Sequence, residues 1–194
     1  MAMGKMMRMA FFGMALLAVL LTAGCDKSGG QQQAPGSGEQ TQVQDRTDGE
    51  NAPKTDKEIS IRLYYPNEDG SKLRGVSRKI TIGKNVDKYT AAIQSLMIGP
   101  KEKGLVAIFP KSAKLRKVIV EKGTAKVDFD QSLIKHFNGG STGEEMLVGS
   151  VVDTLTEFPE VKAVQILIDG QAVETLAGHM DTSTPIKRMD KLIK

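Results

Sequence analysis

The sequence changes character near residue 58, and this change limits how much of the chain can fold. Residues 26–57 are rich in Gly, Gln, Pro and charged side chains, and Val43 is their only large aliphatic residue. Such a segment cannot bury enough apolar surface to offset the entropy lost on ordering. We therefore expect a flexible tether over residues 25–57, with a reach on the order of 30 Å, and one folded domain over residues 58–194.

The first 24 residues have the features of a secretory signal. Lys5 and Arg8 precede an apolar run at residues 9–21, which small residues follow. A positive start, a short apolar stretch and small residues at a cleavage point are typical of exported proteins. The apolar run is also shorter than the ~20 residues of a membrane-spanning helix. The sequence thus predicts that residues 1–24 are removed.

Residues 23–25, Ala-Gly-Cys, resemble the lipobox of bacterial lipoproteins, although Thr22 stands where Leu is usual. In that motif the cysteine is linked to diacylglycerol and becomes the acylated N-terminus. Several acyl chains are enough for stable membrane attachment. The resemblance implies lipid on Cys25 and a location on the extracytoplasmic face of the cell membrane. The alternative is a buried or unpaired thiol, with the leader either cleaved or retained.

Composition excludes several classes of site. The chain has 1 Cys, too few for a disulfide or a four-cysteine zinc site, and its 2 His lack the HExxH spacing of a catalytic zinc site. No metal and no cofactor are therefore expected. It has no Trp and 5% aromatic residues, which argues against a stacking surface for single-stranded nucleic acid. Residues 58–194 carry 21 basic and 17 acidic side chains, an excess too small and too interleaved to indicate nucleic-acid binding.

From residue 59 onward, short apolar segments alternate with turn residues and predict an α+β domain. Period-2 alternation, turn dipeptides and helical apolar stripes give the order β-β-α-β-β-α-β-β. Strands are predicted at 59–65, 73–82, 115–121, 124–130, 161–168 and 171–176, and a helix at 88–98 with Asn85 and Asp87 as N-cap candidates. Lys122-Gly123 is a two-residue connection of the hairpin type. A second helix follows a Ser141–Glu144 capping box and ends before Pro159. We expect a single two-layer domain in which both helices cover one face of a mixed or antiparallel sheet.

Several motifs occur in a fixed order along this domain and together resemble the GerMN domain. They are residues 63–66, 99–100, 127–130, 139–141, 153–159 and 168–179, within a match from about residue 58 to residue 188. The resemblance implies an exported lipoprotein of Gram-positive and spore-forming bacteria, with a fold similar to the ring-building motif and a role in sporulation or germination. Family members carry one or two such domains, and this chain has one. The resemblance brings no catalytic residues with it.

Two acidic residues invite a chemical interpretation. Asp128 and Asp130 flank Phe129 on a predicted strand, so their side chains point to the same side and are candidates to share a metal ion or a proton. The favoured interpretation is a solvated strand end in which Asp130 caps the next turn, because no third ligand is adjacent. Glu144 and Glu145 are interpreted only as first-turn acids that the helix dipole favours.

Two further motifs are candidate binding elements. Gly139, Gly140 and Ser141 precede a helix and resemble an anion-binding turn, but they lack the Gly-Lys-Ser/Thr of a P-loop, so a structural turn with an N-cap is favoured. His179 lies within the best-matched motif, and the Asp169-Gly170 turn is a candidate to orient its ring. The favoured role is a packed histidine whose ring hydrogen-bonds and fixes the C-terminal segment.

Two functions follow. The first is a lipid-anchored, non-catalytic binding or assembly module. Its partners would be the membrane, through the lipid on Cys25, and an envelope protein or wall polymer, with a second copy of the chain as a further candidate. The alternative is a metal-dependent envelope hydrolase using Asp128, Asp130 and His179. An enzyme requires these three side chains to converge in a concave site, whereas a binding module does not.

Overall fold

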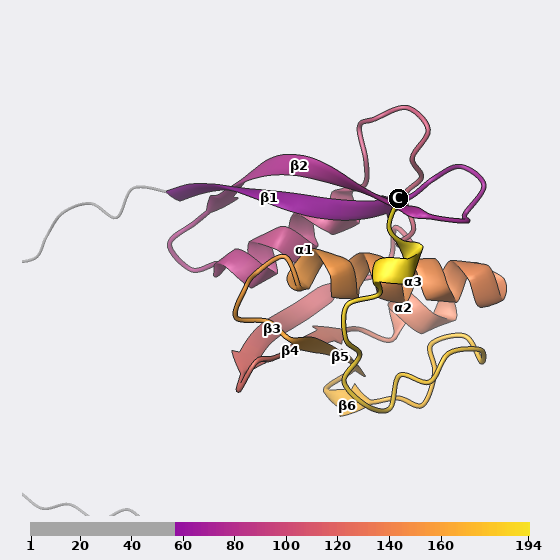
Figure 1. Cartoon of the computed structure of the whole chain (residues 1–194). Helices are drawn as coiled ribbons and strands as arrows, with labels where there is room; N and C mark the ends of the chain where they lie inside the picture. The colour runs from indigo at the N-terminus through magenta and orange to yellow at the C-terminus, as the bar shows by residue number, and fades with distance from the viewer. Residues whose placement is uncertain (1–56) are drawn as a thin grey trace, which may run out of the picture. The chain divides into compact units, whose positions relative to one another are not determined.

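The computed structural model describes residues 57–194, in which a layer of helices lies between two β-sheets (Figure 1). The elements are β1 (Lys57–Pro66), β2 (Leu73–Ile82), α1 (Lys88–Ile98), β3 (Leu115–Glu121), β4 (Thr124–Phe129), α2 (Ser132–Lys135), α3 (Gly140–Leu155), β5 (Ala163–Ile168), β6 (Gln171–Ala172) and a 3₁₀ turn (Asp190–Leu192). β1 and β2 form an antiparallel pair, and the second sheet has the order β3-β4-β5-β6. β4 and β5 run parallel, so α2 and α3 form the crossover that a parallel pair needs.

The β1–β2 hairpin follows the predicted alternation. Ile61, Leu63 and Tyr65 are buried on one face of β1, where period-2 spacing places them. A hydrogen bond of 3.0 Å from the N–H of Gly70 to the carbonyl of Asn67 closes the turn. Gly70 has a φ of 68°, a conformation that glycine adopts without steric cost. The strand prediction for residues 59–65 is therefore confirmed.

Helix α1 begins and ends at residues that the sequence marks. Asp87 and Asn85 are both plausible N-caps, and the structure uses Asp87, whose side chain accepts the N–H groups of Tyr89 at 2.9 Å and Thr90 at 3.0 Å. These bonds satisfy donors that the first helical turn leaves free. The helix ends at Gly99, which has a φ of 93°.

Two-residue turns with positive φ connect the strands of the second sheet. Lys122 and Gly123 have φ values of 48° and 81°, and Asp169 and Gly170 have φ values of 50° and 84°. Such turns match the twist of antiparallel strands and set their register. The predicted β3–β4 hairpin and the turn after β5 are both present.

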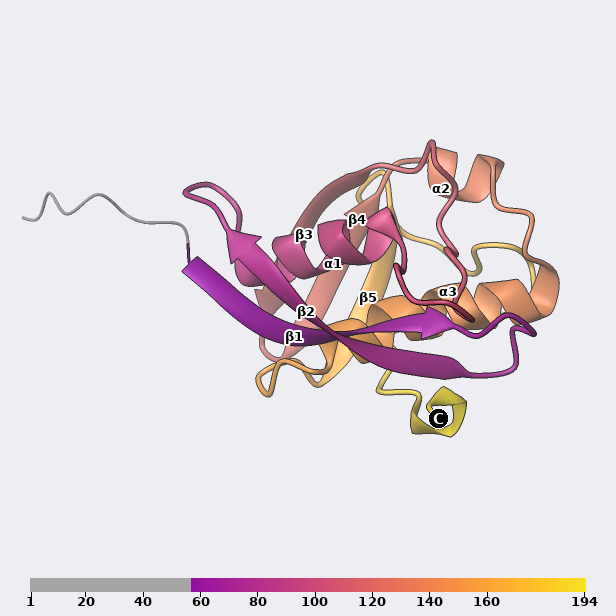
Figure 2. The ribbon, with the colours of Figure 1, turned by 90° about the horizontal axis from the view of Figure 1, so that it is seen from above.

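Helix α3 is the centre of the core. Eleven of its 16 residues are buried, because it packs against β1 on one side, β5 on the other and α1 at its flank. Seen from above, the β1–β2 hairpin lies across α3 (Figure 2). A helix covered on nearly every side is a core helix and not a surface one.

The α+β fold class is confirmed, but the layering differs from the expectation of two layers. The β1–β2 hairpin does not join the other strands in one sheet. Its buried face, with Leu63, and the buried face of the second sheet, with Val127 and Ile166, both need an apolar cover. The helices supply it to both sheets at once, because α1 and α3 each contact strands of both sheets.

The strand predicted at residues 171–176 is shorter than expected, since β6 ends at Ala172. The chain turns away because the N–H groups of Leu176 and Ala177 hydrogen-bond to the carboxylate of Glu144 at 2.8 Å each. These N–H groups therefore bond to a carboxylate on α3 instead of to a neighbouring strand.

Candidate functional site

Asp128 and Asp169 meet at the end of the second sheet, where Arg116 bridges them. Asp128 is buried, with 1% of its surface exposed. Its Oδ1 accepts the N–H of Gly170 at 2.7 Å, and its Oδ2 lies 3.1 Å from Nε of Arg116. The Nη1 of Arg116 is 2.6 Å from Oδ1 of Asp169. The solvated environment expected for Asp128 was therefore wrong, because its carboxylate holds the turn after β5 in place.

Asp130 points to a different partner. Its Oδ1 accepts the N–H of Lys114 at 2.9 Å. That hydrogen bond, followed by weaker ones from Ser132, holds the pKa of Asp130 below its ordinary range. The predicted capping of the next turn by the Asp130 side chain was wrong, because the N-cap of α2 is Gln131 and no side chain caps this helix.

The residues proposed for a hydrolase do not form one centre. Asp128 holds the turn at Gly170 and Asp130 holds the loop at Lys114, and His179 projects from the loop that follows β6. Within residues 57–194, no group of three or more His, Cys, Asp or Glu side chains could hold a metal ion. The convergence on which the hydrolase hypothesis depends is thus missing from the described part of the chain.

The start of α3 differs from the predicted capping box. The N-cap is Gly139 and no side chain caps the helix. Gly140 has a φ of 58°, and Ser141 is exposed. The capping-box prediction was wrong because the Glu144 side chain turns away from the helix start and is fully buried elsewhere.

Glu144 is the residue that the sequence analysis undervalued. Its Oε1 accepts the hydroxyl of Thr175 at 2.6 Å and the N–H groups of Leu176 and Ala177 at 2.8 Å each. Its Oε2 accepts the N–H of His179 at 2.9 Å. Burial raises the pKa of Glu144, but these hydrogen bonds outweigh it and leave the pKa below its ordinary range. We call this set of contacts the Glu144 latch.

A signal for the latch was present in the sequence. Glu144 lies three and four positions before Leu147 and Val148, which places it on the apolar stripe of the helix. A carboxylate on a core-facing stripe must be paired and hydrogen-bonded to be tolerated. The sequence did not indicate its partner, which comes from a loop 31 residues away.

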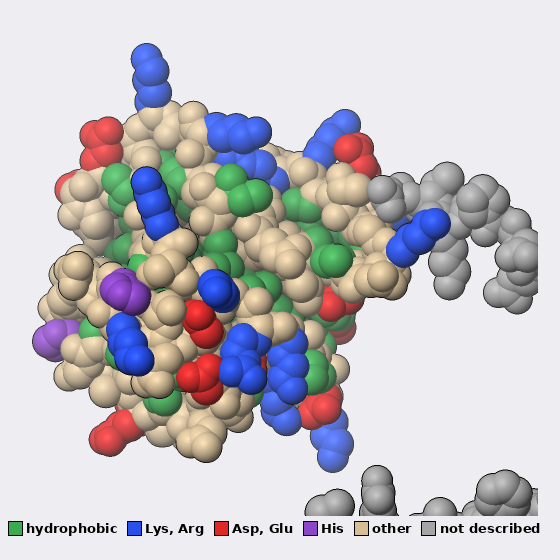
Figure 3. All heavy atoms as spheres, turned by 180° about the vertical axis from the view of Figure 1, so that it is seen from behind, with side chains coloured by type: hydrophobic (Ala, Val, Ile, Leu, Met, Phe, Trp, Pro, Cys, Tyr) green, Lys and Arg blue, Asp and Glu red, His purple; other side chains and the backbone are tan. Residues whose placement is uncertain are grey.

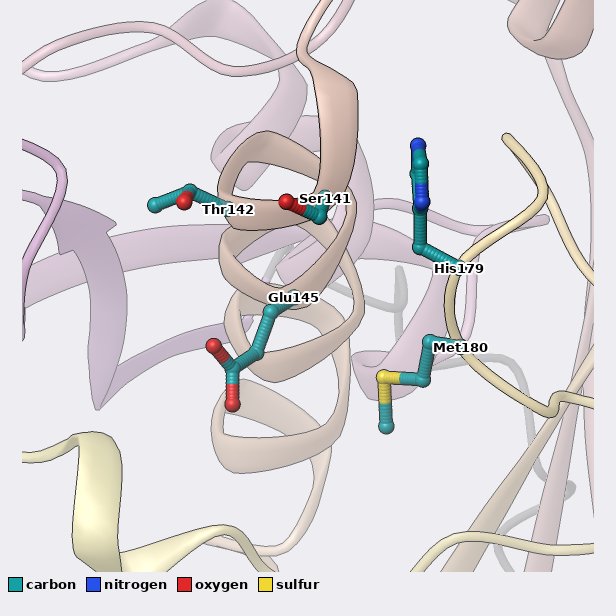
Figure 4. Close-up of a pocket in the computed structure, with 5 residues that line it drawn as sticks. All are labelled: Ser141, Thr142, Glu145, His179 and Met180. Atoms are coloured by element: carbon teal, nitrogen blue, oxygen red, sulfur yellow. The ribbon is translucent and has the colours of Figure 1, made fainter.

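His179 acts through its backbone. Its N–H belongs to the Glu144 latch, while its ring is exposed. The expectation that the ring packs and hydrogen-bonds was therefore wrong, although the residue does help to fix the C-terminal part of the chain. The ring stands beside the first turn of α3 and borders a cavity of about 290 Å³ lined by Ser141, Thr142, Glu145, His179 and Met180 (Figure 4).

The family follows from comparison with known proteins. A family model described as Germane, sporulation and spore germination, matches residues 62–174. The chain belongs to this family. The GerMN resemblance drawn from the ordered motifs is thereby confirmed.

Individual relatives support the same family assignment. Over 122 residues the chain is 34% identical to the spore germination protein GerM of Bacillus subtilis (strain 168), a match that spans 58% of this chain and 32% of GerM. The structure of the tandem GerMN domains of that sporulation protein aligns with a TM-score of 0.53 and 26% identity, over 77% of this chain and 51% of that one. The first GerMN domain alone gives a TM-score of 0.50 at 22% identity, over 67% of this chain and 98% of that one, a likeness of fold. The chain therefore matches about a third of the length of GerM.

Other sequence predictions fall outside the described residues. They are the signal at residues 1–24, the lipidated Cys25 and the tether up to residue 56. Within the part of the chain that the structure does describe, no helix has the length and apolar character to span a bilayer. The lipid anchor remains a prediction from the sequence.

Proposed function

We propose that this Germane-family chain is a lipid-anchored module on the extracytoplasmic face of the cell membrane, which binds or assembles other envelope components during sporulation or germination. The observation that carries the proposal is that the candidate acidic residues have structural roles. Asp128, Asp130 and Glu144 each accept backbone N–H groups that hold loops in place. Carboxylates occupied in this way stabilise the fold, and they do not converge on one site as the acid and base of a catalytic centre must.

The anchor in this proposal is Cys25. It follows a short apolar leader and precedes a polar, Gly-rich segment, so acylation would hold the folded domain near the bilayer, within a reach on the order of 30 Å. Partners are then restricted to molecules at or near the membrane surface: an envelope protein, a wall polymer or a second copy of the chain.

Acylation is tested by mass spectrometry of the mature N-terminus and by fractionation of cells that produce the wild type or Cys25→Ala. We expect an N-terminal peptide that starts at an acylated Cys25, and release of the variant from the membrane fraction. An unacylated wild type outside the membrane fraction would refute the anchor.

The role in sporulation is tested by deletion and complementation in a spore-forming host. We expect the deletion to lower spore yield or germination, the wild type to restore it, and Cys25→Ala to restore it poorly. His179→Ala should separate the two functions, because this residue is exposed and its replacement is expected to leave the fold intact. Metal-dependent turnover of a cell-wall or phosphoester substrate that is lost in His179→Ala would favour the hydrolase instead.

A further inference from the structure

Three adjoining cavities form one groove beside the start of α3. The central one, of about 290 Å³, includes Glu145, His179 and Met180. A second, of about 200 Å³, continues from His179 and Met180 toward Glu174. A third, of about 400 Å³, continues from Glu145 to the segment 188–192. Because neighbouring cavities share lining residues, they adjoin in a row along α3, and we call this row the α3 groove.

Both walls of the α3 groove are held against α3 by buried carboxylates. The Glu144 latch fixes the wall that carries His179 and Met180. On the other side, Oδ1 of Asp153 accepts the N–H of Met189 at 2.7 Å. Figure 4 shows Met180 directed from its loop toward the α3 side that bears Glu145. Walls fixed in this way before binding lower the entropic cost of holding a ligand.

The α3 groove is acidic, although the domain is basic. Glu145, Glu174, Asp181 and Asp190 line it, against Arg188 and Lys191. On the face seen from behind in Figure 3, side chains of both signs occur side by side. With 21 basic and 17 acidic side chains in residues 58–194, a cationic ligand gains nothing from the overall charge and is attracted only locally.

Arg188 does not neutralise these acids fully, because its guanidinium is already engaged. Its Nη2 lies 2.9 Å from Oε1 of Glu157 and donates to the hydroxyl of Tyr64 at 2.6 Å. Its Nε reaches Oδ1 of Asp190 at 3.0 Å. Glu145, where two of the cavities meet, is exposed and free to pair with a ligand.

The apolar part of the lining is provided by two methionines and Leu192. Met180 and Met189 are half-buried in the walls of the α3 groove. Methionine side chains are flexible and polarisable, so they adapt to aliphatic side chains of different shapes. A groove that combines spaced carboxylates with adaptable apolar side chains suits an extended peptide in which cationic and apolar side chains alternate.

We propose that the α3 groove binds an extended peptide segment of an envelope protein that carries several Lys or Arg side chains, with Glu145 pairing the central cation. This inference rests on the proposed function as a binding module and names the chemistry of its partner. Charge complementarity selects the peptide, and the pre-formed walls give it a fixed path.

The test is photo-crosslinking in cells that produce the full-length chain, with benzoylphenylalanine at Met180 in the groove or at Ile119 on the outer face of β3. Crosslinked segments are identified by mass spectrometry. We expect Met180 to capture a segment with several Lys or Arg residues. Glu145→Lys should reduce its yield by about tenfold, as expected for one reversed charge in ionic contact. Glu58→Lys, at the exposed start of β1, is the matched control and should leave the yield unchanged.

Other outcomes overturn the inference in distinguishable ways. A captured segment without cationic residues, a glycan adduct, or a yield that Glu145→Lys leaves unchanged would refute the basic peptide. Crosslinks from Ile119 but not from Met180 would refute the groove and leave the proposed function standing. No crosslink from either position would also refute the groove, whereas the proposed function is refuted separately, by the fractionation and complementation experiments above. Thermal unfolding of each variant confirms that the fold is intact.

Discussion

Replacing Glu144 by alanine should destabilise the domain through a loop that is distant in sequence. The carboxylate accepts four hydrogen bonds, from the hydroxyl of Thr175 and from the N–H groups of Leu176, Ala177 and His179, at 2.6 to 2.9 Å. After truncation these donors face a small cavity instead of an acceptor. The loop at residues 175–179 is then no longer held against the start of α3.

The size of the effect follows from the cost of unpaired donors. Each buried donor without a partner costs about 1–3 kcal/mol, and the loop can open to water, so the costs do not add fully. We expect the free energy of unfolding to fall by about 3–4 kcal/mol, and the melting temperature to fall on the order of 10 °C. The loss is a large part of the roughly 5–15 kcal/mol that stabilises a typical domain.

The assay is urea unfolding followed by circular dichroism, with hydrogen exchange of the amides of Leu176, Ala177 and His179. Glu144→Gln keeps one acceptor oxygen but turns an amide N–H toward a donor, so we expect about half of the loss. Glu145→Ala, one position away and exposed, is the control and should change stability by less than about 0.5 kcal/mol. Equal unfolding midpoints for Glu144→Ala and Glu145→Ala would refute the reasoning.

The pH dependence supplies an independent check. The pKa of Glu144 is lowered in the folded state, so its contribution is present above the unfolded pKa, about 4.3, and is lost as the pH falls through the folded value. The stability difference between the wild type and Glu144→Gln should therefore shrink in acid. A difference that grows below about pH 4 would contradict the assignment.

Further predictions concern packing, a buried acid and two of the three candidate catalytic residues. Gly149→Ala should cost about 1–3 kcal/mol, because its Cβ would lie 2.8 Å from Leu192, whereas Gly143→Ala should be neutral or stabilising by calorimetry. Burial raises the pKa of Asp153, so its stabilising contribution is lost as the pH rises through that pKa, and Asp153→Asn should gain stability over the wild type between about pH 4 and 7 in urea titrations. Asp128→Ala should lower the melting temperature and expose the amide of Gly170 to exchange, whereas His179→Ala should leave both unchanged.

Local patterns determined most of the secondary structure. Alternation at residues 59–65, the Asp87 cap and the Lys122-Gly123 turn act over a few residues, and the structure confirms each of them. The ordered motifs were also enough to identify the family, because they span most of the domain. These features depend on backbone preferences and spacing, which a sequence displays directly.

The tertiary structure decided which side chains these elements bring together. Asp128 and Gly170 are 42 residues apart, and Glu144 and Thr175 are 31 apart. Nothing in the local sequence of either partner specifies the other, so a first-turn acid and a strand-end acid looked ordinary. Burial made them structural, because a carboxylate removed from water must find donors wherever the fold provides them. The sequence predicted a two-layer domain, whereas in the structure the helices pack between two sheets. This packing also forms the groove beside α3.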